Sequence, residues 1–156
     1  MDLELVTIGT ELLLGHTIDT NGAEIARRLA ALGARVVRRT SVPDDPAAIR
    51  DAVASALART GSVITTGGLG PTRDDITKKV VADLYGWPLE FDAGAWESVL
   101  ERYRRFRRTP AASNRSQAEV PRGAIVLPNR WGTAPGLRLE APPGLEGVIV
   151  ADTQVG

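Results

Sequence analysis

The stretch Thr65-Thr66-Gly67-Gly68-Leu69-Gly70-Pro71-Thr72-Arg73-Asp74-Asp75 decides how this sequence is interpreted. A short β-rich run ends at its first residues and a helical pattern begins at its last, so the stretch is a loop between a strand and a helix. Its three glycines let a ligand approach the backbone, and the following helix offers free amides at its N-terminus. The sequence therefore predicts a phosphate-binding loop made by Thr66, Gly67, Gly68, Leu69, Gly70, Pro71 and Thr72.

Two acidic residues at the end of this loop predict a metal site. Asp74 and Asp75 stand where a polyphosphate would dock, and carboxylates and phosphates repel one another unless a cation bridges them. Magnesium is the natural candidate, because it binds one or two carboxylates together with substrate oxygens and water. The alternative is that either aspartate only caps the next helix, a role worth about 1 kcal/mol.

Working outward, three strand-then-helix units follow one another in the first 85 residues. Residues 3–8, 34–40 and 62–66 are β-rich, and after each of them apolar residues recur with helical spacing. The first helix is expected to start with Asn21 as its cap and to bury Ile25, Leu29 and Leu32. Short connections of this kind predict parallel strands with helices on both faces, and they bring the loops after the strands to one edge of the sheet.

Two more loops should reach the same edge. The loop after the first strand can present Glu11, Asp19 and Asn21 to a sugar or a base, although Asp19 and Asn21 can equally close the loop and cap a helix. Asp44 and Asp45 follow the second strand. One of them can face the cleft, while ordinary turn and cap chemistry is the alternative for both.

The second half of the chain is less regular. Asp92 can cap a helix, and residues 124–127, 137–139 and 148–150 are predicted to form short mixed or antiparallel strands. Five arginines between residues 102 and 108 are interpreted as a solvated helix face, with phosphate or RNA binding as the alternative.

Composition narrows the class of protein. With 156 residues, 43% hydrophobic and 24% charged, the chain is expected to form one globular domain over residues 1–156. Nineteen basic and nineteen acidic residues cancel, so no nucleic acid or membrane partner is expected, and the cytoplasm is the predicted location. The absence of cysteine excludes thiolate metal sites, and a single histidine, His16, excludes histidine clusters.

Five motifs together resemble those of the molybdenum-cofactor-biosynthesis (molybdopterin-binding) fold, in particular the N-terminal domain of the CinA, or competence/damage-inducible, protein family. In chain order they are Ile8-Gly9-Thr10-Glu11-Leu12-Leu13-Leu14-Gly15, Asp19-Thr20-Asn21, the stretch 65–77, Asn114-Arg115 with Gln117-Ala118, and Pro128-Asn129 with Gly132-Thr133-Ala134-Pro135-Gly136.

The resemblance implies a three-layer α/β/α sandwich with a mostly parallel mixed sheet, homo-oligomers (dimers or trimers), and a pterin or nucleotide phosphate as ligand. It adds Gly9, Thr10, Asn114, Gln117, Gly132 and Thr133 to the expected ligand-binding residues. By analogy with molybdopterin adenylyltransferases it pairs Asp44 with Asp75 as functional residues, with Glu11 or Asp44 orienting water and Asp74 or Asp75 binding the metal.

The family is associated with metal-dependent hydrolysis of ADP-ribose to AMP and ribose 5-phosphate, which the loops fit. Two alternatives stay open, an adenylyltransferase acting on molybdopterin and a non-catalytic binding module.

The sequence departs from the family in two ways. Nothing corresponds to the C-terminal deamidase domain, and residues 148–156 read Val-Ile-Val-Ala-Asp-Thr-Gln-Val-Gly in place of a Leu-Pro-Gly-Val-Pro loop, which puts the completeness of the pocket in question.

Overall fold

A computed structural model describes residues 1–73, 75–129, 132–140 and 148–150. Eight strands are assigned in it: β1 (Asp2–Ile8), β2 (Arg35–Val42), β3 (Val63–Thr66), β4 (Leu89–Phe91), β5 (Glu119–Pro121), β6 (Ile125–Leu127), β7 (Gly136–Leu139) and β8 (Val148–Val150). The helices are α1 (Thr10–Leu13), α2 (Thr20–Ala31), α3 (Pro46–Thr60), α4 (Thr77–Tyr85), α5 (Ala93–Arg105) and the 3₁₀-helix η1 (Ala112–Ala118).

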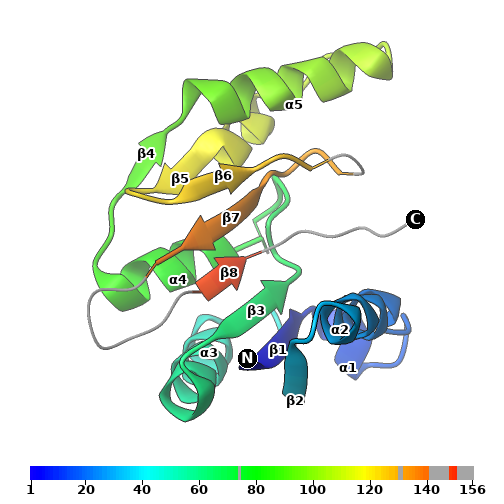
Figure 1. The fold of residues 1–156 in the computed structure, drawn as a ribbon. Helices are drawn as coiled ribbons and strands as arrows, with labels where there is room; N and C mark the ends of the chain where they lie inside the picture. Colours follow the sequence, from blue (N-terminus) through cyan, green and yellow to red (C-terminus); the bar gives the residue numbers. More distant parts are fainter. Residues whose placement is uncertain (74, 130–131, 141–147, 151–156) are drawn as a thin grey trace.

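The main sheet is mixed and mostly parallel, as the sequence predicts. Its six strands lie in the order β2-β1-β3-β8-β7-β6, and the first four are parallel to one another. The strands β7 and β6 continue the sheet in antiparallel fashion, while β4 and β5 form a separate antiparallel pair. Figure 1 shows this pair below α5, at the side of the main sheet.

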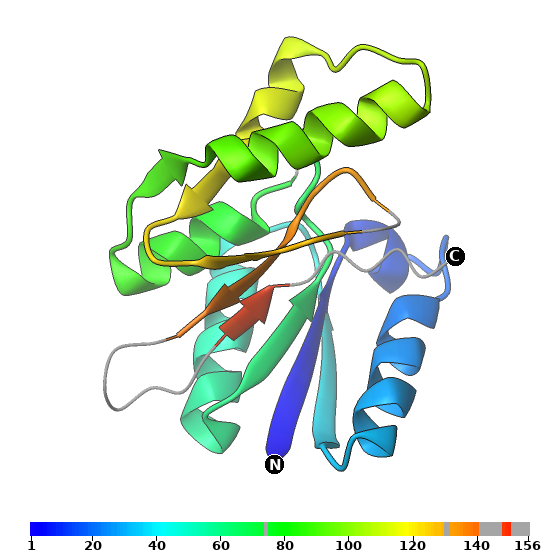
Figure 2. The same ribbon diagram turned by 45° about the horizontal axis from the view of Figure 1, so that its top comes forward.

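Helices lie on both faces of the sheet because successive strand residues point to opposite faces. Val6 and Ile8 of β1 enter a core with α3 and α4, whereas Leu3 and Leu5 pack with Ile25 of α2. Figure 2 shows α3 and α2 on opposite sides of the parallel strands. The described part of the chain therefore has the expected three-layer α/β/α arrangement, and no helix in it is long and apolar enough to cross a membrane.

The start of α2 differs from the prediction. The N-cap residue is not Asn21 but Asp19, for which the sequence leaves capping open as an alternative, and its Oδ1 accepts a hydrogen bond from the Gly22 amide at 2.7 Å. Leu32 is also not inward, since it is 83% exposed. It is the C-cap residue, beyond the last turn that packs on the sheet, so the apolar spacing overshoots the helix by one residue. The loop before α2 contains the one-turn helix α1, which the sequence did not predict.

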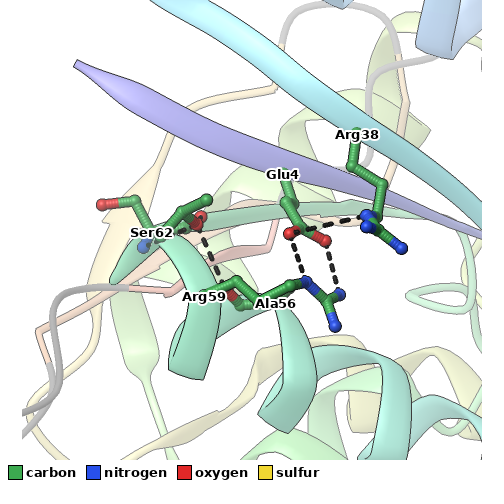
Figure 3. Close-up of polar contacts among 6 residues, drawn as sticks. Glu4, Arg38, Ala56, Arg59 and Ser62 are labelled. Carbon is green, nitrogen blue, oxygen red and sulfur yellow. Dashed lines mark hydrogen bonds and ion pairs between the residues drawn. The ribbon is translucent and has the colours of Figure 1, made fainter.

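An ion pair between the buried Glu4 and the partly exposed Arg59 links α3 to β1. Glu4 lies on β1, between β2 and β3, and is only 2% exposed. Its two carboxylate oxygens accept hydrogen bonds from Nε and Nη2 of Arg59 at 2.6 and 2.7 Å. Arg38 of β2 lies 3.9 Å away on the same face (Figure 3). The hydrogen bonds from Arg59 hold the pKa of the Glu4 carboxyl below its ordinary value, against the opposing effect of burial.

A close backbone approach joins β1 and β3 at the opposite edge of the sheet. Gly67 follows β3 with φ of 99°, and a side chain there would collide with the carbonyl oxygen of Ile8. Thr77, the first residue of α4, donates from Oγ1 to the Gly67 carbonyl at 2.9 Å and from its amide to the Gly68 carbonyl at 3.1 Å. The loop after β3 is thus clamped between β1 and α4.

We predict that Glu4→Gln lowers the free energy of unfolding at pH 7 by about 1–2 kcal/mol, because a charge-assisted bond becomes a neutral one. The folded-state pKa of Glu4 is depressed, so its contribution is complete above the ordinary glutamate pKa of about 4.3 and disappears as the pH falls through the folded value. Urea unfolding at several pH values should show the two proteins converging in acid. Glu97→Gln, which breaks an exposed pair with Arg104, serves as the control and should change little.

We also predict that Gly67→Ala destabilises the fold by about 2 kcal/mol or more, since it adds a backbone clash to a left-handed conformation. Gly33→Ala is the matched control: its φ is 79°, but nothing lies within 4 Å of the added carbon. Thermal unfolding of both variants separates the two contributions. Equal losses would show that the contact with Ile8 adds nothing to the strain.

Candidate functional site

A cleft of about 520 Å³ opens at the carboxyl ends of β1 and β3. Its walls come from four segments: the end of β1 with α1, the start of α2, the turn after β2, and the loop after β3. The lining residues are Thr7, Ile8, Gly9, Glu11, Leu12, Thr17, Ile18, Asp19, Thr20, Asn21, Asp44, Thr66, Gly67, Gly68, Leu69, Gly70 and Asp75. Parallel strands direct their following loops to one edge, which is why these distant segments meet.

Most of the predicted site residues meet in this cleft. Those that line it are Gly9, Glu11, Asp19, Asn21, Asp44, Thr66, Gly67, Gly68, Leu69, Gly70 and Asp75. Thr10 and Thr72 are not lining residues, but they donate hydrogen bonds to two of the lining aspartates. Pro71 is not a lining residue. Asp74 lies outside the described residues. So do residues 151–156, the last part of the stretch that replaces the family's Leu-Pro-Gly-Val-Pro loop.

The two key aspartates are held in the same way by threonines. Asp44 Oδ2 accepts from the amide and hydroxyl of Thr10 at 2.9 and 3.0 Å, across 34 residues of sequence. Asp75 Oδ2 accepts from the amide of Thr72 at 2.8 Å and from the Thr72 hydroxyl. Asp75 does not cap α4, whose N-cap residue is Ile76 and has no side-chain cap. Among the described residues, no donor contacts Oδ1 of either aspartate.

The adjacent Asp45 has the ordinary structural role. It is the N-cap residue of α3, and its Oδ2 accepts from the Ala48 amide at 2.8 Å. It does not line the cleft. The turn 43–46 therefore divides its two acids between the cleft and the helix cap, and this division could not be read from the sequence of the turn.

The loop after β3 presents free amides. The backbone N–H groups of Gly68, Leu69 and Gly70 donate to no described residue, and all three residues line the cleft. The Leu69 side chain, 5% exposed, anchors the loop in the core. A phosphate group placed here would satisfy these donors.

The charge of the described lining is entirely negative. Glu11, Asp19, Asp44 and Asp75 contribute carboxylates, and no lysine or arginine is among the described lining residues. The described residues contain no group of three or more histidine, cysteine, aspartate or glutamate side chains arranged to hold a metal by themselves. These carboxylates would repel an anionic ligand.

Four more predicted ligand-binding residues are not among the described lining residues: Asn114, Gln117, Gly132 and Thr133. Asn114 and Gln117 are 3% and 2% exposed, and they form a buried hydrogen-bonded chain instead. Asn114 Nδ2 donates to the Tyr103 hydroxyl at 2.8 Å and to Gln117 Oε1, and Gln117 Nε2 donates to Thr133 Oγ1 at 3.0 Å. These hydrogen bonds connect η1 to α5 and to the loop before β7. Gly132, in the same loop, donates its amide to Asn129.

Sequence reasoning missed several lining residues. These are Thr7, Ile8, Leu12, Thr17, Ile18 and Thr20. Strand alternation carried a signal for Thr7, since it lies on the face of Leu3 and Leu5 but is polar, and it pairs in register with Thr66. Its hydroxyl lies 2.8 Å from the Ser41 hydroxyl on β2.

The comparisons with known proteins identify the family and the fold of the chain. Residues 4–151 match the family model described as "Probable molybdopterin binding domain". A CinA-like protein of Gemmatimonas aurantiaca is 54% identical over 92% of this chain, and one of Chloroherpeton thalassium is 44% identical over 94%. These alignments cover 34% and 35% of the two relatives, so the chain spans about a third of their length.

Solved structures show the same fold. A CinA protein from Thermoplasma acidophilum superimposes with a TM-score of 0.84 at 32% identity, covering 97% of this chain and 88% of that one. The molybdopterin biosynthesis enzyme MoaB of Thermus thermophilus, at 19% identity and a TM-score of 0.60, covers 97% of this chain and 80% of its own and shares the architecture. From the family match, the sequence identities and the superposition together, the chain belongs to the molybdopterin-binding domain family and, within it, to the CinA-like proteins.

Proposed function

We propose that the cleft binds a phosphorylated nucleotide or pterin through a divalent cation, and that the chain hydrolyses ADP-ribose, or a similar nucleoside diphosphate, to AMP and ribose 5-phosphate. The observation that carries the proposal is the pairing of an acidic lining with a loop of free amides. Amides and carboxylates favour opposite charges, and a bridged pair of a cation and a diphosphate satisfies both.

The donor set suits magnesium. Asp44 and Asp75 each have one oxygen fixed by a threonine and one oxygen that no described residue contacts. One or two carboxylates, with ligand oxygens and water, are the usual magnesium ligands in proteins. Such a cation, when bound, would neutralise charge on the diphosphate and activate water.

The chain's own groups supply the rest. Gly68, Leu69 and Gly70 would hold the diphosphate through their amides, with no reorganisation needed because Thr77 and Leu69 already fix the loop. Glu11 is exposed at the mouth of the cleft, and its carboxylate bonds to no described residue. It is placed to orient a water molecule. The base or pterin ring would then lie toward α1 and the loop before α2, which include the apolar lining residues Leu12 and Ile18.

The test is incubation of the purified protein with ADP-ribose and magnesium, followed by separation of the products. We expect release of AMP that stops when the metal is chelated. Asp75→Asn and Asp44→Asn should each reduce turnover by about 100-fold or more, because each removes a charge from the reacting centre. Asp45→Asn is the matched control, as it keeps the cap of α3 and leaves the cleft lining intact.

The outcomes separate the alternatives. ADP-ribose that binds with magnesium but yields no AMP would refute the hydrolase and select a binding module. The family match favours a pterin as the ligand in that case. Transfer of AMP from ATP to molybdopterin would identify the adenylyltransferase, and Asp75→Asn should abolish that reaction as well.

A further inference from the structure

Asp19 differs from the other acids of the cleft. Glu11, Asp44 and Asp75 form no ion pair with any described residue, whereas Asp19 pairs with Arg39 of β2. Arg39 Nη2 donates to Asp19 Oδ2 at 2.6 Å. The arginine itself is not among the described lining residues, so it acts on the cleft only through Asp19.

Both oxygens of Asp19 are occupied. Oδ1 accepts from the Gly22 amide at 2.7 Å and Oδ2 accepts from Arg39, and the Asp19 side chain is only 18% exposed. The pair packs closely against the start of α2, because a side chain at Gly22 would collide with the Asp19 carboxylate and the Arg39 guanidinium. Asp19 is therefore oriented from two sides.

We propose that Arg39 is a positioning residue for the cleft: its ion pair with Asp19 holds the carboxylate in place and offsets its charge, so that the wall formed by the start of α2 accepts the anionic part of a phosphorylated ligand. The proposal rests on the proposed function of the cleft. It also gives Asp19 a structural role in place of the ligand-binding role expected from the sequence.

Charge accounts for the direction of the effect. The described lining holds four carboxylates, and repulsion between them and a diphosphate rises with each one that is unpaired. Glu11, Asp44 and Asp75 pair with no described cation, whereas the charge of Asp19 is offset by its ion pair with Arg39. Without the arginine, Asp19 would keep its bond to Gly22 and expose the charge of Oδ2 to the cleft.

A double-mutant cycle tests the proposal. ADP-ribose binding in the presence of magnesium is measured by calorimetry for Arg39→Gln, Asp19→Asn and the double variant; asparagine still caps α2 through its carbonyl oxygen. We expect Arg39→Gln to weaken binding about two- to fivefold, the range of a partly exposed pair. The same change in the Asp19→Asn background should have no effect, and Arg39→Lys should restore most of the affinity.

The control is Arg35→Gln. Arg35 lies on the same strand and pairs with Asp2 through Nε at 3.0 Å, but neither residue lines the cleft. Its loss removes the same charge from β2 and should leave binding unchanged. Equal losses for Arg35→Gln and Arg39→Gln, or an equal loss from Arg39→Gln in both Asp19 backgrounds, would overturn the proposal and reduce Arg39 to a surface charge.

A ligand-free measurement keeps this inference separate from the proposed function. The Gly22 amide signal in ¹H–¹⁵N spectra reports the orientation of Asp19, and it should move in Arg39→Gln and stay in place in Arg35→Gln. If the unmodified protein binds no ADP-ribose, the proposed function fails, and the Gly22 signal alone decides the inference. A signal that does not respond to Arg39→Gln would overturn it.

Discussion

The contact between Gly67 and the Ile8 carbonyl is the constraint on which the rest of the cleft depends. Two parallel strands can deliver their loops to one edge without those loops touching. Here the chain after β3 turns so tightly against the end of β1 that only a residue without a side chain fits. Thr77 then binds the two glycine carbonyls, so α4 is packed against the same turn. The result is a loop held on two sides, whose residues Gly68, Leu69 and Gly70 line the cleft and donate their amides to no described residue.

The acids of the cleft divide into groups by their partners, and the partners define what each can do. One oxygen of Asp44 and one oxygen of Asp75 each accept hydrogen bonds from the amide and the hydroxyl of a threonine. These bonds orient the two carboxylates and leave their charge in place. Asp19 is gripped at both oxygens, and one of its partners is an arginine. A hydrogen bond from a neutral donor leaves an aspartate able to attract a cation, whereas an ion pair removes most of that ability.

The two edges of the sheet do different work. At the amino ends of the strands, Glu4 is buried against Arg59 of α3. Both of its carboxylate oxygens accept hydrogen bonds from Arg59, so this carboxylate has a structural role. At the carboxyl edge, polar groups with unused donors and acceptors are concentrated in the described part of the chain. Members of the same fold family with low sequence identity share this architecture, which is set by the strand order and by helices on both faces. The loops at the carboxyl edge are where such proteins can differ in ligand.

Several features were determined by the sequence itself, because they depend on neighbours along the chain. The strand and helix periods, the start of α3 at Pro46, and the glycine loop after β3 are all local, and parallel strands place the loops at one edge. Because the loops after parallel strands lie at one edge of the sheet, Glu11, Asp44 and Asp75 meet in the same cleft. Only the tertiary structure decided which side chains point inward and what they bind. Asn114 and Gln117 form a buried network, and Arg39 reaches Asp19 across 20 residues, because these bonds depend on how α5, η1 and β2 pack, which no local pattern records.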